Sequence, residues 1–510
     1  MRPVPSLLRS SFLWLFLAAP LAAGADSPPA FPGAVGQGAA ATGGRGGDVY
    51  HVVNLDDYKP HEEEKIPGSL RHAIRSAEGP RTIVFDVAGA IALHAPLEVL
   101  KSNLTIAGQT APPPGVTLWG YPFEITDCSD VVVRHLRVRL GDFHAPGSQR
   151  RLPNGQPGNG DLPANKGNAV YVGSGAERVV LDHVSASWGM DETLSVTKGR
   201  DVTIQHCLIA ASLNDSFHSK GDHGYGTLVR GELTPDDQRL ARGGYTFFGN
   251  LWHSHRARNP SIGGQQSLDR GQDEADRRAT DVNLVNNVIY NWGENATHRS
   301  QKGTVRINLV GNYYICGPAK KTRRIFRGDE DAATEVYHAG NFLDADRDER
   351  HDGEPVTADS FDHLDANDSL IDDSSGRPFA FFGDVNEQVR SAPEAYQAVV
   401  ANVGASLDRD AVDQGLISQL QQRSGELIDS QEKLRNEAGV LAGLGDMQPA
   451  RRPADFDTDG DGMADDFERQ RGLDPSDAAD RNGRTLSDAG YTNLEVYLDW
   501  LTQRQSGDQP

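Results

Sequence analysis

VVLDHVSASW, at residues 179–188, is one copy of a short phrase that recurs along this chain. In each copy apolar residues alternate as in a strand, a His or an Asn follows, and another apolar stretch comes after it. The other copies lie at residues 131–139, 202–210, 245–255, 282–291, 307–315 and 336–344. The His or Asn positions are His135, His183, His206, Asn250, Asn287, Asn312 and Asn341.

The shortest intervals between these positions indicate a solenoid. His183 and His206 are 23 residues apart, and Asn287 and Asn312 are 25 residues apart. Strands this short cannot bury an apolar face alone, whereas stacked copies can. We therefore predict an all-β fold, a right-handed parallel β-helix in which the His or Asn side chains stack at a repeated turn. A β-sandwich or a propeller is disfavoured, because hairpin turns such as Asn-Gly are few between the copies.

The chain divides into four segments by composition. Residues 1–25 predict a secretory signal, because Arg2 and Arg9 precede the apolar run LWLFLAAPLAA and a small-residue cleavage pattern. That run is too short to span a membrane, and we expect a secreted or periplasmic protein with no membrane span. Residues 26–350 would form the β-helix, and residues 351–450, which turn to helical periodicity, a helical C-terminal segment that packs on it. Residues 451–510 would form a small EF-hand-like calcium module.

The calcium module rests on the stretch DTDGDGMADDFE, at residues 457–468. Its spacing is that of an EF-hand loop, with oxygen ligands at positions 1, 3, 5, 7, 9 and 12 and a turn-forming Gly at position 6. Position 7 contributes only its backbone carbonyl, and the Glu at position 12 closes the site. The predicted ligands are Asp457, Asp459, Asp461, Met463, Asp465 and Glu468.

Charge and cysteine content narrow the choice of partners. The formal net charge of -22 argues against nucleic acid, which selects basic surfaces, and requires local cations or calcium wherever an anionic substrate binds. The chain has only three cysteines, which are too few for a disulfide framework, although two of them could form one disulfide. They are Cys128, Cys207 and Cys316. Cys207 lies in an apolar strand pattern, which predicts a buried thiol.

The repeat also predicts where chemistry gathers. Asp191 follows His183 by 8 residues and Arg258 follows Asn250 by the same number. If each copy is one rung, the two share a column, about 10 Å apart along the axis. Lys220 belongs to the rung between them. An acid and two cations on one face would form a groove for an extended anionic chain.

Several segments together resemble the pectate lyase-like polysaccharide lyases. They are FPGAVGQG, TGGRGG, GSLRHAI, SNLTIAGQTAPP, DHVSASWGMDE, HSKGDHGYG, HSHRARNPSI and RDAVDQ, and the resemblance covers residues 31–440. It implies a right-handed β-helix, a monomer that acts on an anionic plant-type polysaccharide, and calcium-assisted β-elimination of a pectate-like polyuronate. The C-terminal loop resembles the calcium modules that are appended to secreted polysaccharide enzymes.

The resemblance also implies roles for individual residues. Arg258 matches the proposed catalytic base, Lys220 matches its neighbouring lysine, and Asp191 with Glu192 matches a calcium-ligand position. His218, His223 and Arg256 are candidate substrate-binding residues. Because a free guanidinium is always protonated, Arg258 would need either a sharply lowered pKa or a role in stabilising developing charge.

Some positions depart from the family pattern. Gly263 stands where a second arginine is expected, Ser195 where a calcium acid is expected, and the earlier acidic pair falls near Lys166 and Asn168. Two alternatives therefore stay open. One is a non-catalytic carbohydrate-binding solenoid, and the other is a glycoside hydrolase that uses two carboxylates. Candidate acids for the hydrolase are Asp182, Asp191, Glu192, Asp215 and Asp222.

Overall fold

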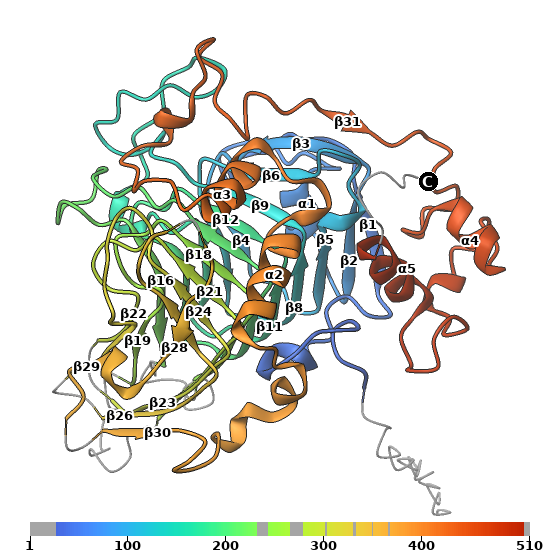
Figure 1. Ribbon diagram of the computed structural model, residues 1–510. Coiled ribbons are helices and arrows are strands. Elements are labelled where there is room, and N and C mark those ends of the chain that lie inside the picture. Colours follow the sequence, from blue (N-terminus) through green and yellow to red (C-terminus); the bar gives the residue numbers. More distant parts are fainter. Residues whose placement is uncertain are drawn as a thin grey trace, which may run out of the picture.

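The computed structural model describes residues 27–231, 243–265, 279–300, 303–329, 333–348, 350–365 and 368–503. Three long sheets wind around one core (Figure 1), and the chain visits them in turn, as in β11, β12, β13 and then β14. Pairing between successive turns is parallel throughout, except at β28 and β31, which join their sheet antiparallel. The predicted right-handed parallel β-helix is confirmed. The predicted secretory signal lies outside the described residues.

Sheet 1 and sheet 2 each collect one strand from every turn of the coil. Sheet 1 contains, in spatial order, β1 (Asp48–Val52), β2 (Arg81–Phe85), β5 (Leu104–Ala107), β8 (Ser129–Arg134), β11 (Glu177–Asp182), β14 (Arg200–Gln205), β17 (Gly243–Phe248), β20 (Thr280–Val285), β23 (Val305–Val310), β26 (Thr334–Ala339) and β30 (Ser369–Ile371). Sheet 2 contains β4 (Leu97–Val99), β7 (Phe123–Thr126), β10 (Val170–Gly173), β13 (Glu192–Thr197), β16 (Tyr225–Arg230), β19 (Ser261–Gly263), β22 (Thr297–Arg299), β25 (Phe326–Arg327) and β29 (Phe361–Asp362).

Sheet 3 follows sheet 1 in each turn. Its strands are β31 (Ala450–Arg451), β3 (Val87–Ala92), β6 (Val116–Trp119), β9 (Leu136–Arg139), β12 (Ser185–Ser187), β15 (Leu208–Ala210), β18 (Leu251–His253), β21 (Val288–Tyr290), β24 (Tyr313–Ile315), β27 (Phe342–Asp344) and β28 (Glu354–Pro355). The pairing of Glu177 with Arg200 and of Asp281 with Arg306 reproduces the intervals of 23 and 25 residues that the sequence predicts.

The core forms because alternate strand residues point inward and meet their equivalents in the next turn. Val179 pairs with Val202 and Leu181 with Ile204, and all four are buried. Each such contact is between apolar, mostly β-branched side chains, which pack well on a pleated surface. All three cysteines are buried and free, so the predicted buried thiol at Cys207 is confirmed and no disulfide forms.

Helices cover one end and one side of the coil. α1 (Leu70–Arg75) packs against β1, β2 and β4, and its N-terminus is capped by the Ser69 side chain. α2 (Ala392–Asn402) and α3 (Ala411–Gln421) lie over sheet 3 (Figure 1). α4 (Asp465–Arg471) and α5 (Asn493–Thr502) lie beside β1. In the described part of the chain, no helix combines the length and the apolar character needed to cross a bilayer.

A ladder of buried amides lines the corner between sheets 1 and 3. The Asn287 side chain accepts hydrogen bonds from the backbone and side-chain N–H groups of Asn250, at 2.9 and 3.0 Å, and donates to the Phe247 carbonyl at 3.0 Å. Asn312 and Asn341 repeat the pattern in the next turns. Each amide therefore satisfies a backbone group of the turn before it, which holds the register of the stack.

The histidines form a different column from the asparagines. His135, His183 and His206 all have left-handed φ angles, between 51° and 55°, and the next turn places Gly249 in this column. The register instead aligns Asn250 with Cys207. The prediction that His and Asn stack at one turn position is therefore wrong by one residue, because His and Gly occupy the left-handed position and Asn the next.

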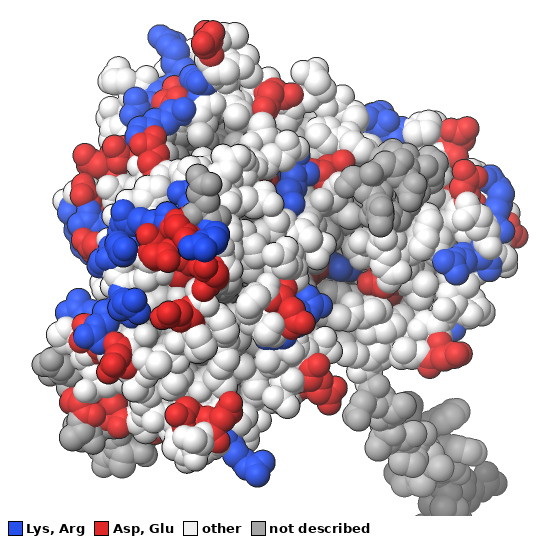
Figure 2. Space-filling view, viewed as in Figure 1, with Lys and Arg blue, Asp and Glu red and all other residues white. Residues whose placement is uncertain are grey.

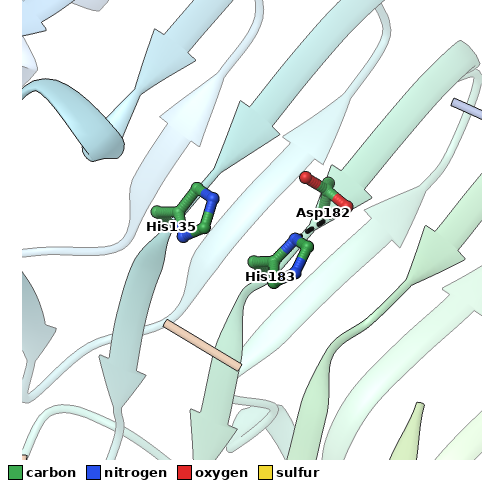
Figure 3. Close-up of side chains that lie close together, drawn as sticks. All are labelled: His135, Asp182 and His183. Atoms are coloured by element: carbon green, nitrogen blue, oxygen red, sulfur yellow. Dashed lines mark ion pairs between the residues drawn. The ribbon is translucent and has the colours of Figure 1, made fainter. Parts of the chain in front are cut away.

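The imidazoles of His135 and His183 stack, with Asp182 beside them (Figure 3), and the tilted ring of His206 lies 4.9 Å from that of His183. The rings of His135 and His183 lie 4.7 Å apart, and Asp182 pairs with Nδ1 of His183 at 2.9 Å and with Arg134 at 2.8 Å. Burial lowers the pKa values of His135 and His183, and their mutual repulsion and Arg134 add to the effect on His135. The histidine column therefore favours the neutral form of the His135 and His183 imidazoles.

Removal of one ladder amide should cost stability. We expect Asn287→Ala to lower the free energy of unfolding by roughly 2–4 kcal/mol, because it leaves the Asn250 N–H and the Phe247 carbonyl buried without partners. Chemical denaturation measures the change. Asn154→Ala, at an exposed turn, is the control and should change stability by less than about 0.5 kcal/mol. Equal losses in both variants would show that the ladder does not hold the stack.

The histidine column should make the fold sensitive to acid. Because the folded-state pKa values of His135 and His183 lie below the unfolded value of about 6.5, the unfolded chain takes up protons first as pH falls. Stability is therefore lost below about pH 6.5. We expect His135→Asn, which tolerates the left-handed φ, to lose less thermal stability than the parent between pH 7.5 and 5. An identical loss in both proteins would contradict this origin.

Candidate active site

The predicted site residues gather at one end of sheet 2, because they precede three neighbouring strands. Asp191 and Glu192 open β13, the loop at residues 213–224 leads into β16, and the segment at residues 254–260 leads into β19. The register pairs Glu192 with Tyr225 and Tyr225 with Ala257. Three segments that are remote in sequence thus end side by side.

The register corrects one detail of the predicted arrangement. Since Ala257 aligns with Glu192, Arg258 lies one position beyond that column and two beyond Asp191. The expectation of a shared column for Asp191 and Arg258 is therefore wrong. The shift between His and Asn accounts for one position, and the segment from Gly249 to Ala257 is one residue shorter than the segment from His183 to Glu192, which accounts for the other. The Arg258 side chain instead contacts Glu192, the residue that follows Asp191.

Arg258 is held from two sides. Its guanidinium donates to the Glu192 carboxylate and lies over the Tyr225 ring, 3.9 Å from the ring centroid. Its backbone has a left-handed φ of 64°, and its carbonyl accepts a hydrogen bond from Thr227 at 2.7 Å. About a quarter of the side chain, 23%, stays exposed. The anchored cation therefore faces solvent with one edge only.

Asp191 lies against a stacked pair of histidines. Its Oδ1 is 3.0 Å from Nε2 of His223 and 4.0 Å from Nε2 of His218. The two imidazole rings are parallel, with centroids 3.7 Å apart. Nδ1 of His218 accepts the backbone N–H of Lys220 at 3.2 Å. The sequence grouped these residues correctly, but only the fold shows that both rings face Asp191.

The electrostatic surroundings of the site are mixed. Burial and the adjacent Asp191 carboxylate raise the pKa of Glu192, and Arg258 opposes that rise. Burial and His223 lower the pKa of His218. On the neighbouring turn, burial and the charges of Arg258 and Arg230 lower the pKa of His298 to about 3. Arg258 and Arg230 thus make a further positive charge unfavourable at His298.

The remaining predicted residues lie nearer the surface. Lys220 is exposed, and its ammonium has no partner among the described residues. Arg256 forms ion pairs with Asp222 and, at 2.6 Å, with Glu294. On the face shown in Figure 2, basic side chains gather on the side where Figure 1 places β16, β19 and β22, with acidic ones among them. The net negative charge of the chain does not make this side uniformly acidic.

Sequence reasoning missed two contributors. Tyr225 supplies the ring beneath Arg258, and Arg230 lies over Gly263, where an added Cβ would come within 2.7 Å of the Arg230 Cδ. Tyr225 lies within HSKGDHGYG, at residues 218–226, and begins the strand β16, which was a usable signal. The proximity of Arg230 to Gly263 follows from strand register and has no local signal.

The groove does not fit a resident calcium ion. Calcium takes six to eight oxygen ligands, with several carboxylates among them. In the described part of the chain, Asp191 lies against His218, His223 and one further acid, Glu192, which is itself bonded to Arg258. The other acids proposed for a hydrolase lie apart, since Asp182 is in the histidine column and Asp222 is paired with Arg256.

The C-terminal loop has the opposite character. Carboxylate oxygens of Asp459, Asp461 and Glu468 are buried with no hydrogen-bond partner, and one oxygen of Asp480 joins them. Ligand atoms of Asp461, Glu468 and Asp480 lie within 4.8 Å of one another, as do those of Asp457, Asp459 and Asp461. Burial and mutual repulsion raise the pKa of Asp461 to about 7 and that of Glu468 to about 8. A divalent cation bound by oxygen fits this set.

Comparison with curated proteins identifies the family. The chain is 33% identical over 477 residues to a probable pectate lyase C of Emericella nidulans, with 92% of each chain covered. It is 31% identical over 506 residues to a probable pectate lyase C of Aspergillus flavus, with 98% and 99% covered. The chain belongs to the pectate lyase family. No model of a protein family matches the sequence.

Solved structures of pectate lyases are also similar to this family member. A pectate lyase of a Bacillus species in complex with trigalacturonate is 14% identical, covers 73% of this chain and 98% of its own, and has a TM-score of 0.45. Pectate lyase C of Erwinia chrysanthemi is 14% identical, covers 72% and 96%, and has a TM-score of 0.37. The major cedar pollen allergen Jun a 1 is 19% identical, covers 73% and 92%, and has a TM-score of 0.43.

Proposed function

We propose that this protein is a secreted polysaccharide lyase that cleaves a pectate-like polyuronate by β-elimination. One observation carries the proposal, namely the anchored and partly exposed guanidinium of Arg258 at the end of sheet 2. Its curated relatives are named as pectate lyases, which is the activity that this arrangement serves. Net charge argues against nucleic acid as a partner, and we expect the enzyme to act as a monomer.

The reaction requires the C5 proton of a uronate to become acidic. When that proton leaves, negative charge develops on the C6 carboxylate, the C4–C5 double bond forms and the C4 oxygen departs. Because a free guanidinium is always protonated and that of Arg258 is held by the Glu192 carboxylate and the Tyr225 ring, we assign Arg258 to the stabilisation of this charge and not to proton removal. Lys220 is exposed in the loop before β16 and would bind a substrate carboxylate.

The proton acceptor that we propose is Asp191 together with His223. Glu192 is engaged by Arg258, and Nδ1 of His218 is engaged by the backbone of Lys220. Asp191 keeps 19% of its side chain exposed and lies 3.0 Å from His223, which can share the proton. His218 and Arg256 remain proposed substrate-binding residues, as N–H donors at the rim.

Calcium has two proposed places in this chain, and they differ in fit. In the groove, Asp191 and Glu192 lack the further oxygen ligands that calcium requires, so no step above depends on it. In the module at residues 451–510, the loop of Asp457, Asp459, Asp461, Met463 and Glu468 fits calcium, which would neutralise its buried acids.

The proposed segments at residues 1–25, 26–350 and 351–450 keep the roles of secretory signal, catalytic β-helix and packing segment.

The lyase activity is tested on polygalacturonate by the ultraviolet absorbance of the unsaturated product. We expect Arg258→Lys to lower the rate by roughly 100-fold or more, because lysine keeps the charge but loses the planar group that Glu192 and Tyr225 hold. Arg306→Lys, which alters an ion pair with Asp281 on sheet 1, is the matched control and should act within about twofold of the parent.

Three outcomes of this assay would contradict parts of the proposal. Reducing ends without ultraviolet absorbance would establish hydrolysis. Full activity of Arg258→Lys would remove Arg258 from the chemistry. If Asp191→Asn retained full activity, the proton acceptor would have to be another group.

The calcium loop is tested by thermal unfolding of the metal-free protein. Since an ion that binds only the folded state stabilises it, we expect calcium to raise the Tm by at least roughly 2 °C, and a chelator to reverse the rise. Asp461→Asn should abolish the response, because Asp461 is fully buried and belongs to both groups of converging acids. Asp488→Asn, at an exposed acid of the same module, should keep it. An unchanged Tm in the parent protein would contradict the proposed site.

A further inference from the structure

The acids of the C-terminal loop converge on a point that the twelve-residue pattern does not complete. Glu468 is fully buried and neither of its carboxylate oxygens has a hydrogen-bond partner. Asp461 is also fully buried, with Oδ2 unpartnered. A buried carboxylate without a partner is costly, so both side chains indicate a cation that they would surround.

Asp465, the acid at position 9 of the pattern, is bonded to other groups of the protein. Oδ1 of Asp465 accepts the Thr458 N–H at 2.8 Å, and Oδ2 accepts the Thr458 hydroxyl at 2.8 Å and pairs with Arg469 at 2.9 Å. Both oxygens are therefore occupied by donors. Asp465 closes the loop at the start of α4 and does not belong to either converging group.

Asp480, which lies outside the twelve-residue pattern, converges with Asp461 and Glu468. Oδ1 of Asp480 is buried without a partner and lies within 4.8 Å of ligand atoms of Asp461 and Glu468. Its Oδ2 accepts the Asp474 N–H at 3.1 Å, which fixes the orientation of the carboxylate. Asp480 is 12 residues beyond the last position of the loop, so no spacing rule for such a loop includes it.

We propose that Asp480, and not Asp465, completes the cation site, and that the occupied site ties the C-terminal module to the first strands of the β-helix. This inference rests on the proposed calcium loop. The ligand is a hard divalent cation with oxygen preference, of which calcium is the one that suits several carboxylates in a flexible geometry.

Asp480 connects the site to α5. Nδ2 of Asn493, the first residue of α5, donates to the Asp480 carbonyl at 2.9 Å, and the Asn493 N–H donates to the Gly483 carbonyl at 2.8 Å. α5 then buries Leu494 and Leu498 in a cluster that includes Ala107 of β5. A cation held by Asp480 would therefore restrain α5, the helix that packs against sheet 1.

The loop itself touches the first strand of the coil. Nε2 of His51, in β1, is 3.2 Å from the Gly460 carbonyl. Met463 is buried in the same cluster as Ala107, with Val49 of β1 packed against it, and a Cβ at Gly462 would lie 3.1 Å from a methyl of Val49. Both halves of the site, the loop and α5, thus rest on β1 and β5 (Figure 1).

Calorimetric titration of the metal-free full chain with calcium separates the two acids. We expect Asp480→Asn to weaken binding by roughly tenfold or more, and Asp465→Asn to change it by less than about threefold. Both substitutions keep an oxygen and remove a charge, so they are a matched pair. Asp477→Asn, an exposed acid three residues before Asp480, controls for a general loss of negative charge.

The outcomes distinguish the inference from the proposed loop. If the parent protein binds no calcium, the loop proposal fails and this inference with it. If the parent binds and Asp480→Asn binds equally well, only the role of Asp480 is overturned. The tie to the β-helix is read from amide hydrogen exchange, which calcium should slow in Asp48–Val52 of the parent and not of Asp480→Asn. Unchanged exchange in β1 on calcium binding would overturn the tie.

Discussion

The buried amide ladder sets the register on which every other contact depends. Each Asn side chain bonds the backbone of the preceding turn, so one turn cannot slide against the next without leaving buried groups unpaired. The same register brings Glu192, Tyr225 and Ala257 into line at the far end of sheet 2. A constraint at one corner of the coil thereby positions the site at another.

The repeat and its period could be predicted from the sequence because they are local and recur many times. The exact column could not, because His, Gly and Asn all suit a left-handed turn residue, and the sequence does not show which of two adjacent positions holds it. His206 aligns with Gly249, and this shift, together with a segment that is one residue shorter before Ala257, moved Arg258 two positions away from the expected column. The pairing of Arg139 with Asp410 and Asp413 spans more than 270 residues and has no signal in spacing.

The chain has a net negative charge, yet its candidate site contains an anchored cation, the Arg258 guanidinium. A buried ion pair such as that of Glu192 with Arg258 contributes little to stability once desolvation is counted, but it fixes one geometry. The ring of Tyr225 supports the other face of the guanidinium without competing for its donors. The charge is thus presented to the groove already oriented, which suits stabilisation of an anion better than exchange of a proton.

The calcium module shows where a short motif stops being informative. A twelve-residue pattern specifies a turn and the acids along it, and Asp457, Asp459, Asp461 and Glu468 lie together as that pattern predicts. It cannot specify an acid that a helix delivers from outside the loop, because the position of Asp480 depends on the packing of α5 against β5. We therefore expect the proposed site and the docking of the module to depend on each other, so that the metal affinity of the loop would include the energy of that contact.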